Sequence, residues 1–106
     1  MTIHEQLEKT WPTLSFELQM GNIGSELTRA RVFHKRGERE AFRSSLDRAN
    51  ELVALTIDDA RWKGRRKELT RLMEVIGDWY QQGKEYGVPI EWLAQYATQF
   101  VYSIRR

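Results

Sequence analysis

Residues 58–69, DDARWKGRRKEL, combine two aspartates and a tryptophan with five cations, namely Arg61, Lys63, Arg65, Arg66 and Lys67. We call residues 58–67 the basic turn. If a helix begins near residue 60, these cations lie at its positive end, where they oppose the helix dipole. An anion would gain from both the dipole and the side-chain charges. One hypothesis is therefore a phosphate or nucleic-acid site at the basic turn.

The same residue types also fit a purely structural interpretation. Asp58 or Asp59 can cap the helix through its first backbone N–H groups. Together with Glu68, the aspartates can neutralise most of the cations. Trp62 can pack over the turn with an arginine stacked on its ring. The sequence leaves both interpretations open.

A second basic stretch, TRARVFHKRGER, contains Arg29, Arg31, Lys35 and Arg36. Arg29 and His34 are separated by four residues, a spacing that resembles the R-x(4–6)-H motif of the HEPN family of helical-bundle proteins. The resemblance implies an Arg–His pair that cleaves RNA. Here the pair lies in the first long helix, whereas the family's motif lies late in the bundle. The ordinary alternative is a histidine that interacts with the negative end of its own helix.

Other catalytic patterns are missing from the sequence. It contains no phosphate-binding G-x-x-x-x-G-K-[ST], no H-E-x-x-H and no cysteine. The carboxylate pairs Glu5/Glu8 and Glu74/Asp78 are equally typical of exposed helix faces. We therefore expect no catalytic residues, no metal and no cofactor, and a function in binding rather than catalysis.

Helical spacing of apolar residues predicts the elements that carry these side chains. Four helices are expected over residues 13–36, 38–57 and 60–82, and from Pro89 onward, with stops near Gly37 and at Gly83 and Gly87. The predicted core stripes are Phe16, Met20, Ile23, Leu27 and Ala30; Phe42, Leu46, Ala49 and Val53; Leu69, Leu72, Met73, Ile76, Trp79 and Tyr80; and Ile90, Leu93, Ala97, Phe100, Val101 and Ile104. Short links favour antiparallel neighbours. We predict an all-α single domain over residues 1–106, an up-down four-helix bundle with a short N-terminal helical segment.

Two glycines lie inside the first long helix, at positions 21 and 24. Each costs roughly 1 kcal/mol in a helix relative to alanine. Either Gly21 and Gly24 allow another helix to approach closely, or they kink or break the helix.

The fourth helix has only a narrow polar strip. A helix that is apolar around most of its circumference is usually buried on several sides. We expect self-association through Trp92, Tyr96, Phe100 and Tyr102, together with Gly21 and Gly24. Alternatively, residues 1–12 cover these aromatic side chains within one chain.

A broader pattern extends over about two thirds of the chain: NIGSE, then ELVALTIDD, then RWKGRRKELTRLME. It resembles a group of small bacterial helical-bundle proteins with no assigned activity. The resemblance implies a helical bundle, and it singles out Asn22, Gly24, Glu26, Trp62, Gly64 and Arg65 as positions to test.

The charge distribution limits the choice of partner. Residues 29–71 hold 13 Lys and Arg against 7 Asp and Glu, whereas both ends of the chain are mildly acidic. No apolar run approaches the roughly 20 residues of a membrane span, so we expect a cytoplasmic protein. The leading function is a self-associating binding module. The alternative is an RNA- or DNA-binding accessory protein that uses Arg29, Arg31, Lys35, Arg36, Arg61, Lys63, Arg65 and Arg66.

Overall fold

The computed structural model describes the backbone of residues 3–103 and the side chains of residues 5–100. Its α-helices are α1 (Ile3–Thr10), α2 (Phe16–Lys35), α3 (Arg39–Ile57), α4 (Arg66–Asp78) and α5 (Ile90–Ser103), and its 3-10 helices are η1 (Trp11–Thr13), η2 (Ala60–Arg65) and η3 (Trp79–Gln81). The fold is all-α, as predicted. Within residues 3–103, every helix is too short or too polar to span a lipid bilayer.

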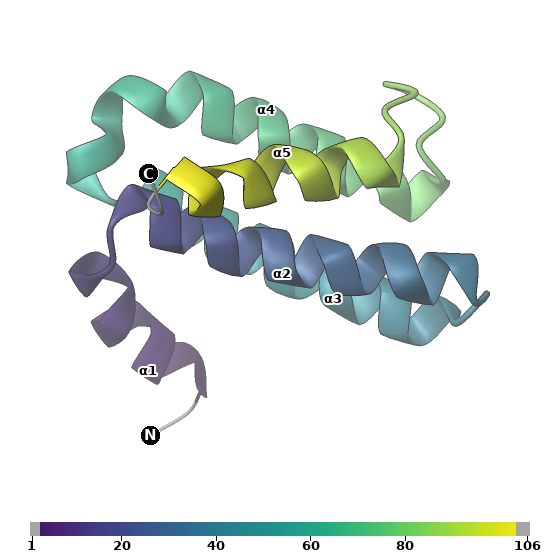
Figure 1. Cartoon of the computed structure of the whole chain (residues 1–106), viewed down its shortest axis with the longest axis horizontal. Coiled ribbons are helices and arrows are strands. Elements are labelled where there is room, and N and C mark those ends of the chain that lie inside the picture. Colours follow the sequence, from purple (N-terminus) through teal and green to yellow (C-terminus); the bar gives the residue numbers. More distant parts are fainter. Residues whose placement is uncertain (1–2, 104–106) are drawn as a thin grey trace.

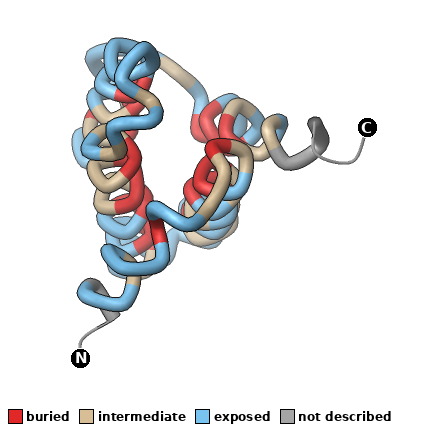
Figure 2. The backbone as a smooth tube through the Cα atoms, turned by 90° about the vertical axis from the view of Figure 1, so that its left-hand side faces the viewer, coloured by how far each residue is buried: buried red, intermediate tan, exposed pale blue. Residues whose placement is uncertain are grey.

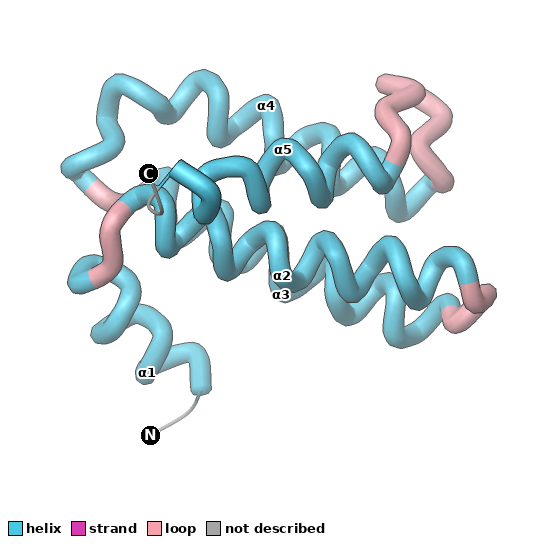
Figure 3. Tube along the Cα trace, viewed as in Figure 1, coloured by secondary structure: helices cyan, strands magenta, loops and turns pink. Residues whose placement is uncertain are grey.

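Helices α2 to α5 form the bundle, and α1 is a short N-terminal arm (Figure 1). The long helix α2 packs against both α3 and α5, and α4 packs on α3. Successive helices run in opposite directions, so the α2–α3 turn and the α4–α5 loop lie at the same end of the bundle (Figure 3). Figure 2 shows that the buried stretches lie on the facing sides of the helices.

The predicted stripes account for most of the core. Every predicted core residue of α2 and α3 is buried, as are Leu69, Leu72 and Ile76 of α4 and Ile90, Leu93 and Ala97 of α5. Phe100 of α5 is half-buried, and the side chains of Val101 and Ile104 lie outside the described residues. Met73 and Trp79 are half-buried, whereas Tyr80 is 37% exposed. Helix α2 starts where the Ser15 hydroxyl accepts a hydrogen bond from the Leu18 backbone N–H at 3.2 Å, and its C-terminal turn closes at Gly37, whose φ of 72° suits glycine.

The two glycines of α2 do not break it, because the helix is continuous from Phe16 to Lys35. Gly24 is buried under α5, and a Cβ placed there would lie 2.6 Å from Thr98 Cγ2 and 3.0 Å from Thr98 N. The helix that approaches α2 closely at Gly24 is thus α5 of the same chain. Gly24 therefore lies at an intramolecular contact rather than on a surface open to a second copy.

The predicted single helix over residues 60–82 is wrong in its extent. A 3-10 segment precedes α4, and Trp62 inside it has non-helical angles of φ −107° and ψ 25°. A second 3-10 turn follows α4, and Gln82 then adopts a left-handed φ of 63°. Long-range hydrogen bonds from Arg61 and Trp62 hold the first of these irregular segments in place.

The α4–α5 loop is anchored by Asp78, which is only 4% exposed. Its carboxylate accepts hydrogen bonds from the backbone N–H groups of Glu85 and Tyr86 and from the Gln81 side chain. Burial acts to raise the pKa of Asp78, but these donors outweigh it, so the pKa is lowered overall. The carboxylate thus fixes the loop in its charged form.

Candidate functional site

The basic turn is held together by an ion pair between neighbouring residues. The Arg61 guanidinium donates from Nε to Asp59 Oδ1 at 3.0 Å and from Nη2 to Asp59 Oδ2 at 2.7 Å. It also donates to the Leu14 carbonyl at 2.7 Å, which ties the turn to the start of α2. Asp59 caps η2 by accepting from the Arg61 backbone N–H, and Arg61 Cζ lies 4.5 Å from the Trp62 ring centroid. These contacts are the aspartate cap and the arginine stacked on Trp62 that the structural interpretation of the basic turn predicts.

A buried amide extends this network into the core. Gln19 is fully buried, and its Nε2 donates to the Trp11 carbonyl at 2.8 Å and to Asp59 Oδ2 at 3.1 Å. Its Oε1 accepts from Trp62 Nε1 at 2.8 Å. The hydrogen bond from Arg61 lowers the pKa of Asp59 to about 2, although burial opposes this, and the bond from Gln19 adds to it. The role of Gln19 could not be predicted from the sequence, because its hydrogen-bond partners lie far from it along the chain.

Two further guanidiniums of the basic turn are also engaged. Arg65 Cζ lies 4.3 Å from the Phe16 ring centroid, and its Nη1 lies 3.8 Å from Glu68 Oε2. Arg66 Nε donates to the Ile57 carbonyl at 3.1 Å. Lys63 is exposed. The geometry therefore favours the ion-paired interpretation over an anion site at the basic turn.

In the second basic stretch, Arg29 and His34 are not brought together. Arg29 Nη1 pairs with Glu26 Oε1 at 2.5 Å, and Arg48 Nε pairs with Glu26 Oε2 at 2.9 Å. This cluster lines a cavity of about 450 Å³ between α1, α2 and α3. His34 lines a different cavity, at the α2–α3 turn. The two residues therefore line separate cavities, and an Arg–His pair of the HEPN kind stays a hypothesis.

The remaining cations of that stretch line a third depression. Arg31, Lys35 and Arg36 are exposed and line it together with Glu91. They lie at the α2–α3 end of the bundle, whereas the basic turn lies at the opposite end (Figure 1). The eight candidate cations therefore do not form one continuous surface.

The apolar side of α5 is covered only in part. Ile90, Leu93, Ala94 and Ala97 are buried, but Trp92 is 51% exposed. The Trp92 ring stacks on Tyr96 with a centroid distance of 5.3 Å and an interplanar angle of 11°. Phe100 is half-buried against Phe16. We call Trp92, Tyr96 and Phe100 the aromatic strip.

The other interface candidates have different surroundings. The side chain of Tyr102 lies outside the described residues, and Gly21 is half-buried on α2. Helix α1 extends away from α5 (Figure 1), so the described residues of the N-terminal arm do not cover the aromatic strip.

An aromatic cavity of about 430 Å³ lies at the α2–α3 turn, and we call it the turn pocket. Three rings from separate elements meet there: His34 lies 5.1 Å from both Phe42 and Trp79, and Phe42 lies 6.2 Å from Trp79, as measured between ring centroids. Trp79 is fixed by a hydrogen bond from its Nε1 to the Val88 carbonyl at 3.0 Å. The three rings therefore form an aromatic wall in which Trp79 is held in place.

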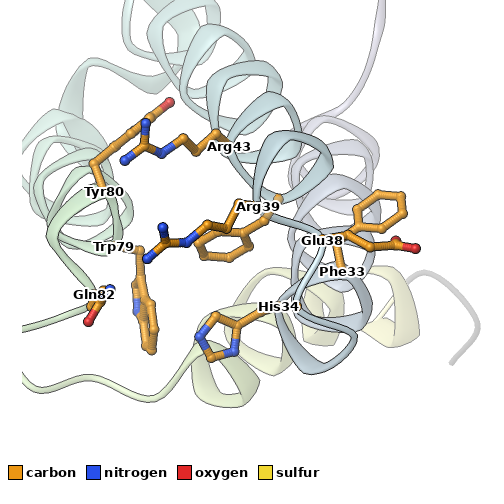
Figure 4. A pocket seen from close by; sticks show the side chains of 10 residues that line it. Phe33, His34, Glu38, Arg39, Arg43, Trp79, Tyr80 and Gln82 are labelled. Atoms are coloured by element: carbon orange, nitrogen blue, oxygen red, sulfur yellow. The ribbon is translucent and has the colours of Figure 1, made fainter.

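Two guanidiniums reach the turn pocket from α3 (Figure 4). Arg39 extends toward Trp79 and Arg43 toward Tyr80, whereas the Glu38 carboxylate points away from the rings (Figure 4). No carboxylate among the described side chains pairs with Arg39 or Arg43. Neither arginine was among the sequence-based candidates, although their spacing of four residues beside Phe42 could have indicated a shared face.

Besides Glu38, a second acidic residue, Asp47, lies next to a lining residue of the turn pocket. The Tyr80 hydroxyl donates a hydrogen bond to Asp47 Oδ1, so this carboxylate is engaged by a neutral donor. Among the side chains of residues 5–100, no three His, Asp or Glu residues gather in an arrangement that could hold a metal ion. The turn pocket thus presents aromatic surface and positive charge.

Comparisons with protein-family models, with curated proteins and with solved structures find no match to this chain.

Proposed function

We propose that this chain is a binding module whose turn pocket holds a small ligand that joins a flat apolar ring to an anionic group. The observation that carries this proposal is the pairing of a three-ring wall with two guanidiniums that have no carboxylate partner. The aromatic faces provide stacking surface, and a guanidinium binds an anion through charge-assisted hydrogen bonds. The cavity volume lies in the range of small-molecule sites.

The pocket is open to water, which sets how tightly such a ligand is held. His34, Arg39 and Arg43 are all exposed, so solvent and salt screen the charges. We expect modest affinity that falls as the salt concentration rises.

A titration with phenyl phosphate tests the proposal. The indole N–H signal of Trp79, assigned by the substitution Trp79→Phe, should shift in nuclear magnetic resonance spectra as phenyl phosphate is added. Replacing both Arg39 and Arg43 with Gln should weaken binding at least about tenfold, which corresponds to about 1.4 kcal/mol. The matched control replaces Arg31 and Lys35 with Gln, because it removes the same charge from the same end of the bundle. Equal loss of binding in both double variants would reduce the effect to net charge and contradict the proposed site.

A second candidate function is self-association across the aromatic strip, favoured by the 51% exposure of the stacked Trp92. Aromatic side chains that are half open to water are typical anchors of protein interfaces. Sedimentation velocity over the micromolar range should show a dimer that Trp92→Ser abolishes. The control is Leu18→Ser, since Leu18 is 45% exposed on another helix. A wild-type monomer at every concentration would remove this candidate.

A further inference from the structure

This inference rests on the proposed function. We infer that the ligand of the turn pocket is a nucleoside monophosphate, with its base against Trp79 and its phosphate between Arg39 and Arg43.

The anionic part of the ligand follows from the two arginines. Arg39 and Arg43 are four residues apart, so they share one face of α3. A guanidinium fork matches two oxygens of a phosphate, and one phosphate dianion can bridge two such forks. A carboxylate can also bridge two guanidiniums, but it carries one negative charge against the two of a phosphate dianion and has one oxygen fewer. The pair of arginines therefore favours a phosphate.

The start of α3 adds to this preference. Glu38 is the N-cap residue of α3, and its side chain makes no capping hydrogen bond. The first N–H groups of a helix have no intrahelical partner, and they form the positive end of the helix dipole. Arg39 lies in this first turn and lines the same pocket as Gly37 and Glu38. A dianion placed between the arginines gains from this end of the helix as well.

The planar part of the ligand follows from Trp79. Its indole is held at Nε1 by Val88 and is in contact with Gly83, where an added Cβ would lie only 3.2 Å from the ring. The ring is thus a fixed platform that loses little freedom when a base stacks on it. Aromatic platforms of this kind accept any nucleobase, since every base has a π-face.

Two polar side chains stand beside this platform. The His34 imidazole lies against Trp79 with an interplanar angle of 79°, and the Gln82 amide lies near the indole in Figure 4. Imidazole and amide groups can both donate and accept hydrogen bonds. They can therefore form hydrogen bonds with the polar edge of a stacked base. A hydrocarbon ring has no such polar edge.

The volume favours a ligand with both parts. The turn pocket measures about 430 Å³, which is more than a phosphate ion or a single six-membered ring fills. A base, a sugar and one phosphate together extend from the Trp79 side of the cavity to the arginine side. The same chemistry also occurs at the 5′-phosphorylated end of an RNA strand, so the experiment includes both sources.

Isothermal titration calorimetry on the full chain compares four probes: adenosine 5′-monophosphate, adenosine, ribose 5-phosphate and phenyl phosphate. The nucleotide should bind at least about tenfold more tightly than adenosine or ribose 5-phosphate, because each of these lacks one of the two contacts. Arg39→Gln with Arg43→Gln should weaken the nucleotide and leave adenosine unchanged. His34→Ala, a substitution at an exposed residue, should weaken the nucleotide and leave ribose 5-phosphate unchanged.

The outcomes separate this inference from the proposed function. If phenyl phosphate binds through Arg39 and Arg43 but the nucleotide binds no more tightly, the assignment of a nucleotide ligand is wrong and the proposed function stands. If neither compound binds, the nucleotide ligand and the proposed function are both wrong. The third outcome concerns a 5′-phosphorylated oligoadenylate. If it binds more than about tenfold more tightly than the mononucleotide, the ligand of the turn pocket is the phosphorylated end of an RNA strand, and the assignment to a mononucleotide is wrong. Equal binding of the two supports the inference.

Discussion

The contact between Gly24 and α5 makes a sharp prediction about stability. In the substitution Gly24→Ala, the new Cβ would lie 2.6 Å from Thr98 Cγ2, 3.0 Å from Thr98 N and 3.2 Å from Ala97 C. The nearest atom belongs to a side chain, but the other two are backbone atoms of α5. Rotating Thr98 would break the hydrogen bond from its hydroxyl to the Ala94 carbonyl, and it would leave the backbone contacts in place. Helix α5 must therefore move away from α2.

Two opposing effects set the size of the change. Overpacking of a tight contact costs about 1–3 kcal/mol, whereas alanine in a helix interior gains about 0.5–1 kcal/mol over glycine. The difference is a net loss of up to about 2.5 kcal/mol in the free energy of unfolding, and we expect the upper half of that range because two of the three contacts are with backbone atoms. For a domain of this size, such a loss lowers the Tm by about 5–10 °C.

Thermal and urea denaturation followed by circular dichroism measure this loss. The matched control is Gly77→Ala, because Gly77 also lies in a helix and a Cβ there meets no atom within 4 Å. Gly77→Ala should stabilise the chain by about 0.5–1 kcal/mol. Adding Thr98→Ser to Gly24→Ala removes the closest contact and should restore part of the lost stability. A Gly24→Ala variant that is at least as stable as the wild type would refute the close packing of α2 against α5.

Two further predictions concern the network around the basic turn. Gln19→Leu should lower the free energy of unfolding by about 1–3 kcal/mol, since the Trp11 carbonyl and the Trp62 indole N–H lose their partner; urea denaturation measures this, and unchanged stability would contradict it. The pKa of Asp59 is lowered from 3.8 to about 2, so its contribution to stability is complete above about pH 4 and is lost as the pH falls toward 2. Asp59→Asn should therefore lose less stability than the wild type across that window in Tm measurements, whereas parallel curves would assign the acid sensitivity to other groups.

Most of the fold could be predicted from the sequence because the core stripes are local patterns. Phe16, Met20, Ile23 and Leu27 recur with helical spacing, and each is buried in the bundle. The same applies to Gly37, whose left-handed backbone ends the α2–α3 turn. Such signals need only neighbouring residues, so tertiary contacts reinforce them rather than override them.

The break before α4 could not be predicted, because its causes lie elsewhere in the chain. Arg61 donates to Leu14, which is 47 residues away, and Trp62 donates to Gln19, which is 43 residues away. These bonds hold Trp62 out of helical geometry although the local sequence favours a continued helix. The spacing of apolar residues along one helix does not depend on a buried glutamine of another helix, so this spacing cannot predict the break.

The density of charge along the sequence proved a poor guide to where charge is available for a ligand. The basic turn has the closely spaced cations, but Arg61, Arg65 and Arg66 are held by contacts with the chain itself. Arg39 and Arg43 lie in a stretch where alternating Glu and Arg suggest local neutralisation, yet both lack an ion-pair partner among the described side chains. An arginine is free to bind a ligand only when the fold offers it no nearer acceptor. That condition depends on how α3 packs against α4, and it is met at the turn pocket because the element facing those arginines presents aromatic rings instead of carboxylates.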